Sequence, residues 1–112
     1  MMREKRRYLQ LQIISQKKFS EEEAKHLIYE SVFQLLGEQG ASEAALQVKA
    51  FDFENQKALV KCSLSSYQKV IAALALKAKF RDLPVSIRLQ KVYGTLEKAK
   101  TVFPSLKKAK GY

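Results

Sequence analysis

REKRRYLQLQII, residues 3–14, is the stretch that decides the fold. Its second half alternates, with Leu9, Leu11 and Ile13 on one side and Gln10 and Gln12 on the other. A period of two residues indicates a β-strand with one buried face. Just before it stand four cations: Arg3, Lys5, Arg6 and Arg7. We therefore expect a buried strand that begins in a basic arm, residues 1–7, and such an arm needs an anionic partner.

The length and composition fit one domain spanning residues 1–112. A chain of this size with 46% hydrophobic residues can build one core and is too short for two. No segment approaches the ~18 consecutive apolar residues of a membrane span, and the N-terminus lacks the apolar stretch of a signal peptide. We expect a cytoplasmic protein without membrane contact. The single cysteine, Cys62, excludes an intramolecular disulfide and a cysteine-cluster metal site.

Positive charge is concentrated at the two ends of the chain. The 21 Lys and Arg residues exceed the 11 Asp and Glu residues, which gives a net charge of +10. Residues 1–18 carry a net +5, residues 19–56 a net −6 and residues 57–112 a net +11. A polyanion, first of all a nucleic acid, should therefore meet the two ends and avoid the middle.

A helix is predicted to begin at Ser20. Ser20 and Glu23 form an S-x-x-E capping box, and Gly37 and Gly40 are expected to end the helix. The core face has helical spacing and consists of Ala24, Leu27, Ile28, Ser31 and Leu35. The glutamates at positions 21–23 favour the positive end of the helix dipole, which explains them better than a catalytic cluster does. The lone His26 is expected to be solvated.

The second half of the chain predicts a hairpin, a helix, a strand and a last helix. Residues 46–53 and 57–64 form the hairpin, and Ser65 or Ser66 caps the next helix, whose apolar stripes reach Phe80. That helix is apolar around more than half its circumference, so either deep burial or a protein interface over Leu76 and Phe80 would explain it. A fourth strand follows at Val85, Ile87 and Leu89. Thr95 is expected to cap the last helix, and residues 105–112 form a basic tail that is expected to be frayed.

This order predicts an α/β (α+β) sandwich of ferredoxin-like type. The βαββαβ pattern gives an antiparallel sheet in the order 4-1-3-2, with two helices on one face and an extra C-terminal helix. Because strand 4 then runs antiparallel to strand 1, the basic arm should meet the start of the last helix, whose free N–H groups favour phosphate. The candidate RNA-binding residues are Arg3, Lys5, Arg6, Arg7, Tyr8, Lys91, Gly94, Thr95, Lys98 and Lys100.

Contact with phosphates of a structured RNA is favoured over stacking of bases on the sheet, because residues 56–62 contain no aromatic side chain and Tyr8 is the only candidate nearby. A protein partner is expected on the surplus apolar side chains of the two helices: Tyr29, Phe33, Leu36, Leu76 and Phe80. No phosphate-binding loop or Ser/His/Asp set is present, so no catalytic or metal-binding residue is predicted in this chain.

The sequence resembles the archaeal ribonuclease P protein component 2 family, the archaeal relatives of the eukaryotic Pop-five subunit. The similarity extends over about residues 3–104 and is carried by four segments: residues 3–9 (REKRRYL), residues 36–40 (LGEQG) followed by Phe51-Asp52, residues 60–62 (VKC), and residues 94–96 (GTL) before a basic helix. Each segment alone is weak, but four in register are more specific.

The resemblance implies a non-catalytic subunit of the ribonucleoprotein that removes the 5′ leader of precursor tRNA. It implies pairing with ribonuclease P protein component 3, with a homodimer inside a heterotetramer as one arrangement. The chemistry is then performed by ribonuclease P RNA with Mg²⁺, and no cofactor is bound by this chain. Two other interpretations stay open: a ferredoxin-like RNA-binding or protein-interaction module associated with ribosomal RNA, and a small nuclease that acts through Asp52 and Asp82.

Overall fold

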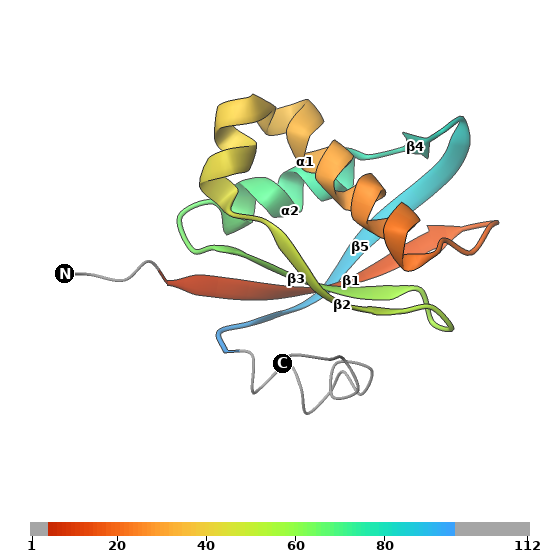
Figure 1. Ribbon diagram of the computed structural model, residues 1–112, viewed down its shortest axis with the longest axis horizontal. Helices are drawn as coiled ribbons and strands as arrows, with labels where there is room; N and C mark the ends of the chain where they lie inside the picture. Colours follow the sequence, from red (N-terminus) through yellow and green to blue (C-terminus); the bar gives the residue numbers. More distant parts are fainter. Residues whose placement is uncertain (1–4, 96–112) are drawn as a thin grey trace.

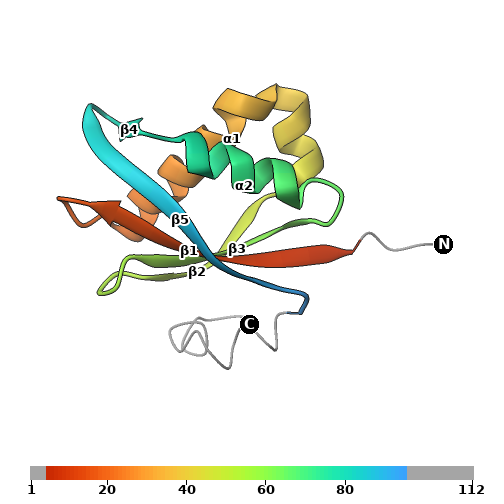
Figure 2. The same ribbon diagram turned by 180° about the vertical axis from the view of Figure 1, so that it is seen from behind.

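Two helices cover one face of a five-stranded antiparallel sheet in the computed structural model, which describes residues 5–95 (Figures 1 and 2). The elements follow in the order β1 (Arg6–Ser15), α1 (Glu21–Ala44), β2 (Gln47–Asp52), β3 (Lys57–Ser63), α2 (Tyr67–Leu76), β4 (Lys79–Phe80) and β5 (Leu83–Tyr93). The helix expected after Thr95 lies outside the described residues. Within residues 5–95, no helix is both long and apolar enough to cross a membrane.

β1 is the centre of the sheet, as its alternating sequence predicts. It pairs antiparallel with β3 on one side and with β5 on the other, so the prediction that the first and last long strands are antiparallel neighbours is confirmed. The full strand order is β2-β3-β1-β5-β4. The predicted four-strand order, 4-1-3-2, was incomplete because β4 adds a fifth strand at the β5 edge.

The larger of two buried clusters lies between the helices and one face of the sheet, and a smaller one, Ala50, Leu59 and Tyr93, lies on the other face. Leu9, Leu11 and Ile13 point into the larger cluster from β1, as the period of two predicts. The neighbouring strands contribute Ala58, Val60, Cys62, Val85 and Ile87, and the helices contribute Leu27, Ile28, Val70 and Leu74. Cys62 is fully buried, and burial raises the pKa of its thiol to about 11. It is therefore a packing residue that reacts poorly as a nucleophile.

The first helix begins as predicted and ends later than predicted. The Ser20 hydroxyl accepts a hydrogen bond from the Glu23 backbone, and the Glu23 carboxylate accepts one from the Ser20 backbone, so the capping box is confirmed. Gly37, with φ +75° and ψ −177°, interrupts the helix without ending it, and α1 resumes as far as Ala44. Leu35, expected in the core, is exposed at the groove between α1 and α2.

The second helix is shorter than predicted. It ends at Leu76, because Lys77 adopts an extended conformation and the chain continues into β4. Phe80 therefore does not extend the apolar stripe that contains Leu76. Its ring is 2% exposed and packs edge-on against Phe19, with 5.8 Å between the ring centres. The sequence left burial and a protein interface open for Phe80, and its assignment to a partner surface was wrong; the two-residue strand β4 is too short to show a period of its own.

A buried glutamine joins the β2–β3 turn to the loop before α1. Gln56 is only 8% exposed and has φ +53°. Its side-chain carbonyl accepts the Phe19 N–H at 2.8 Å, and its side-chain amide donates to the carbonyl oxygens of Phe19 and Phe53. The turn itself spans four residues, 53–56, rather than the expected three. One side chain thus binds three backbone groups, of which the N–H and C=O of Phe19 would otherwise be buried without partners.

Gln56→Ala should destabilise the fold by about 2 to 3 kcal/mol, because it leaves the buried N–H and C=O of Phe19 without partners. The matched control is Gln39→Ala, an exposed glutamine on α1, which should change the free energy of unfolding by less than about 0.5 kcal/mol. Urea denaturation of the two variants measures both values. Equal values would show that the Gln56 bonds contribute nothing specific to stability.

Candidate nucleic-acid interface

The face of the sheet that points away from the helices carries most of the cations of the strands. Side chains of paired residues point to the same side of a sheet, so the register assigns each residue to a face. Tyr8, Gln10 and Gln12 of β1 pair with residues of β3 and β5 on this open face. The cations placed there by register, together with the bulge residue Lys49, are Arg6, Lys49, Lys57, Lys61, Arg88 and Lys91. One carboxylate, Asp52, accompanies them on the described strands.

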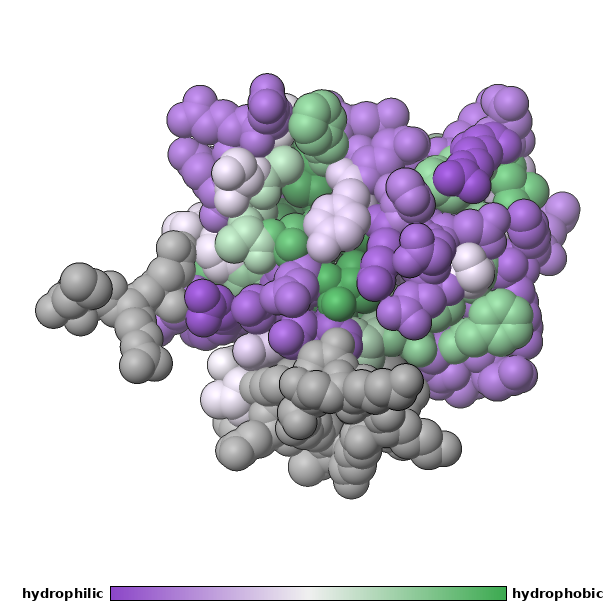
Figure 3. All heavy atoms as spheres, in the orientation of Figure 1, coloured by the Kyte–Doolittle hydropathy of each residue, from purple (hydrophilic) through white to green (hydrophobic). Residues whose placement is uncertain are grey.

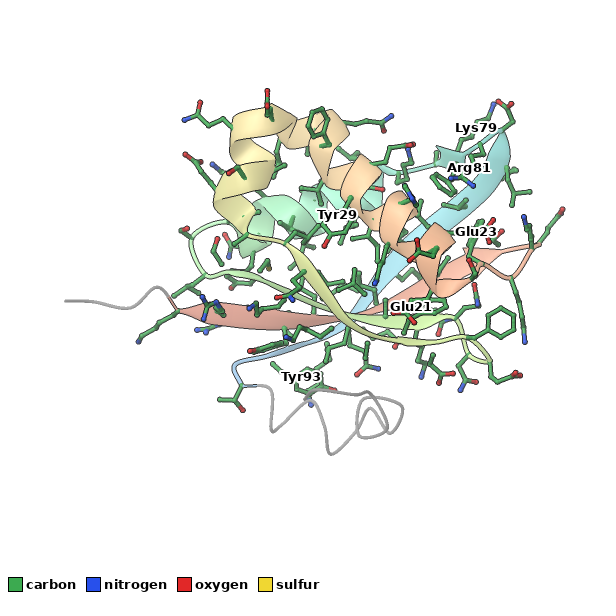
Figure 4. The ribbon with its side chains drawn as sticks, in the orientation of Figure 1. Glu21, Glu23, Tyr29, Lys79, Arg81 and Tyr93 are labelled. Carbon is green, nitrogen blue, oxygen red and sulfur yellow. The ribbon has the colours of Figure 1, made fainter. Side chains whose placement is uncertain are left out.

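Most of the acidic residues among residues 5–95 lie in the other layer. α1 carries six glutamates and one lysine, and none of its glutamates lies on the sheet. Figure 4 shows Glu21, Glu23 and Tyr29 on α1, whereas Tyr93 lies on the far side of the sheet. The acidic middle of the sequence is thereby folded away from the basic ends. A polyanion would meet a basic sheet face without passing the acidic helix.

The predicted basic residues converge in part. Because Tyr8 pairs with Tyr93, the start of β1 lies beside the end of β5, which brings Lys5, Arg6 and Tyr8 toward Lys91, Gly94 and Thr95 (Figure 1). Arg6 and Arg7 do not share a face, however, because consecutive strand residues point to opposite sides. Arg6 faces outward with Tyr8, and Arg7 faces the helix side with Leu9. Arg3, Lys98 and Lys100 lie outside the described residues.

A row of hydrogen-bonded polar side chains crosses the open face. The Tyr93 hydroxyl donates to Gln10 Oε1 at 2.8 Å, and Gln10 Nε2 donates to Gln90 Oε1 at 2.8 Å. The Lys91 ammonium lies 5.6 Å from the centre of the Tyr93 ring. Tyr93 is only 6% exposed, so its ring is not available as a stacking platform for a base. The open face therefore carries cations and hydrogen-bond donors beside a buried apolar cluster of Ala50, Leu59 and Tyr93, against which Tyr8 packs.

The residues predicted for a protein partner divide into surface and core. Phe33 and Leu76 are 53% and 69% exposed, and Tyr29 is also exposed. Leu36 is partly buried against the core, and Phe80 is buried. The Lys77 ammonium at the end of α2 contacts Glu30 and Gln34 of α1. Apolar surface emerges among polar surface over this helical layer (Figure 3).

Residues 7–103 match the model of the Rpp14/Pop5 family. The chain belongs to the Rpp14/Pop5 family. It is 33% identical to ribonuclease P protein component 2 of Methanocaldococcus jannaschii over 109 residues, which cover 97% of this chain and 80% of that protein. It is 32% identical to the Pyrococcus abyssi protein of the same name over 93% of this chain and 88% of that one.

A solved structure has the same fold. A chain in the cryo-EM structure of yeast ribonuclease MRP superposes with a TM-score of 0.67 over 96% of this chain and 95% of that chain. The sequence identity is 8%, so the similarity concerns the fold alone.

Asp52 and Asp82 of this Rpp14/Pop5 chain, which were considered for catalysis, both have structural roles in turns. Asp52 accepts hydrogen bonds from the backbone and side-chain nitrogens of Asn55, and these bonds hold the pKa of its carboxyl below the usual range. Asp82 occupies the β4–β5 turn with φ +67°, a conformation that aspartate tolerates better than most residues. Residues 5–95 contain no group of three His, Cys, Asp or Glu side chains that could hold a metal ion.

Sequence reasoning missed some cations of the candidate interface. Lys49, Lys57, Arg88 and Tyr93 were not recognised as residues of the open face, and Lys61 was recognised only as facing away from Cys62. The alternation of residues 57–61 contains the necessary information, since Lys57 and Lys61 share a face. Assigning that face to the surface required the pairing of Lys57 with Gln12 and of Lys61 with Tyr8.

Tyr93 should ionise at higher pH than an exposed tyrosine, because burial raises the pKa of its hydroxyl above the ordinary 10.0. The neutral Tyr93 hydroxyl should contribute fully to the free energy of unfolding below pH 10.0. This contribution should be lost as pH rises through the higher pKa of the folded state. Alkaline titration of tyrosinate absorbance measures this. Tyr93→Phe should remove a late component from the titration curve, and an unchanged curve above pH 10.0 would contradict the assignment.

Proposed function

We propose that this chain is a protein subunit of ribonuclease P, the ribonucleoprotein that removes the 5′ leader of precursor tRNA. The family match over residues 7–103 carries the proposal, together with relatives that are each named ribonuclease P protein component 2. This chain spans 80% or more of the length of those relatives, so the comparison covers most of each protein.

The role of the subunit is to support the catalytic RNA through phosphate contacts. The separation of a basic open face from an acidic helical layer supports this role, because RNA can be bound on one side while the other side stays free. The proposed contacts are made by Lys5, Arg6, Arg7, Tyr8, Lys91, Gly94 and Thr95, and by Arg3, Lys98 and Lys100 outside the described residues. RNA phosphates bind Mg²⁺, and the RNA catalyses the hydrolysis. The particle is cytoplasmic.

The helical layer meets a protein partner, for which we propose ribonuclease P protein component 3. Two such pairs join as a heterotetramer through contact between two copies of this chain. The exposed side chains of Tyr29, Phe33 and Leu76 support the proposal that this layer is covered in the particle. Isolation of the protein from native cells and sequencing of its bound RNA tests the whole proposal. One dominant structured RNA is expected, and ribosomal RNA alone would contradict a ribonuclease P subunit.

Asp52→Asn and Asp82→Asn should leave leader removal by a reconstituted particle close to unchanged. A lost metal ligand or general base would cost ~100-fold or more in rate. The double variant Arg6→Ala/Arg7→Ala should lower activity most at low Mg²⁺ and recover in part as Mg²⁺ is raised, because the metal replaces lost phosphate neutralisation. The measurement is the cleavage rate across a Mg²⁺ series. If either aspartate variant abolishes cleavage at every Mg²⁺ concentration while the protein stays folded, the chain takes part in the chemistry.

Phe33→Asp and Leu76→Asp should block assembly with the protein partner and leave RNA affinity nearly intact. Both side chains are more than half exposed, so the charged residue is tolerated by the isolated fold. Size-exclusion chromatography with the partner measures assembly, and circular dichroism measures folding. Val70→Asp is the control that should unfold the chain, since Val70 is fully buried. Unfolding by all three substitutions would place Phe33 and Leu76 in the core instead.

A further inference from the structure

Three cations gather on three adjacent strands of the open face. Lys61 lies on β3, where it pairs with Tyr8 of β1 on one side and Gln47 of β2 on the other. Arg6 is one same-face step from Tyr8 along β1. Lys49 is the extra residue of the β2 bulge, between Val48 and Ala50. Neighbouring strands are about 4.8 Å apart, so the three backbone positions lie across a width of roughly 10 Å.

Within residues 5–95, the neighbouring charges that shift the pKa of Lys61 are repulsive. Its pKa is lowered first by burial and then by the charges of Arg6 and Lys49. Lys57, four residues away on the same strand and face, differs because it pairs with Asp52 and helps to lower the pKa of that carboxyl. A half-buried cation beside two like charges costs folding free energy, and an anionic ligand would remove that cost.

The neighbouring side chains indicate which part of a nucleic acid is bound. β3 has no aromatic residue between Lys57 and Ser63, and the Tyr93 ring is buried with its hydroxyl already donating to Gln10. Base stacking is therefore poorly served here, whereas Lys and Arg side chains suit phosphate oxygens. The ligand that fits is the backbone of a folded RNA, whose bases are already stacked and paired.

We propose that Arg6, Lys49 and Lys61 form one phosphate-binding cluster, which holds the backbone of a structured RNA against the open face over β1, β3 and β2. The identity of the polyanion as RNA rests on the function proposed above. The cluster lies on the β3 side of β1, whereas the segment from Lys91 to Thr95 lies on the β5 side. RNA bound by both would cross β1, the central strand of the sheet.

The sharpest test is Lys61→Met in the full chain, because the cluster predicts effects of opposite sign on stability and binding. Methionine keeps the apolar stem and removes the charge, so the melting temperature should stay the same or rise. Affinity for an RNA hairpin with a defined stem should fall. The slope of log affinity against log salt is negative, and it should become less steep by roughly 0.7 to 0.9 for the lost phosphate contact. Arg6→Ala and Lys49→Ala should give similar decreases in the slope.

Lys57→Met is the matched control, since it removes a lysine from the same strand and face that already has a carboxylate neighbour. Its salt slope should change by less than half as much. An unchanged slope in Lys61→Met, or an equal decrease in Lys57→Met, would overturn the cluster. If Lys61→Met fails to fold, the exposed Arg6 gives the same comparison through Arg6→Ala. A wild-type chain that binds the hairpin through the cluster and still supports no leader removal would refute the proposed function and keep the cluster.

Discussion

The pairing of β1 with strands on both sides is the constraint on which the rest of the structure depends. β1 lies between β3 and β5, so its two faces become the two sides of the whole sheet. Leu9, Leu11 and Ile13 bury one face under the helices. A shift of one residue in register would turn these three apolar side chains to the open face and bury the glutamines in their place. The same shift would move Arg6 to the helix side and disperse the basic residues of the open face.

This arrangement separates the charges by layer. The six glutamates of α1 lie above the sheet, and the cations of β1, β2, β3 and β5 lie largely on its opposite face. In the linear sequence the charges form three blocks, which suggests that a polyanion avoids the whole middle segment. Folding changes this picture, because the middle block contributes α1 to the acidic layer and Lys49 to the basic face. One small domain thereby has a basic face and an acidic helical layer on opposite sides of its sheet.

Strong local patterns predicted the parts of the fold that depend on local physics. The alternation in β1 and the capping box at Ser20 were evident from sequence, and the order of the elements then gave the neighbouring positions of β1 and β5. The break at Gly37 was expected, but the resumption of α1 was not, because a glycine in a left-handed conformation is compatible with either outcome. Phe80 was misplaced because its burial depends on Phe19, a contact between segments far apart in sequence.

The same distinction applies to the candidate interface. Arg6, Tyr8 and Lys91 were identifiable from charge and position, whereas Lys49 and Lys61 became part of a site only through the pairing of three strands. Gln56 was treated as an ordinary turn residue, although its side chain joins two loops.

Photo-crosslinking of the assembled native particle tests the separation of surfaces most directly. The photoreactive residue p-benzoylphenylalanine can replace Gln47, an exposed open-face residue that pairs with Lys61, or Phe33 on the outer side of α1. Position 47 is predicted to crosslink to RNA, and position 33 is predicted to crosslink to protein. Crosslinks to RNA from position 33, with none from position 47, would contradict the assignment of RNA to the open face of the sheet.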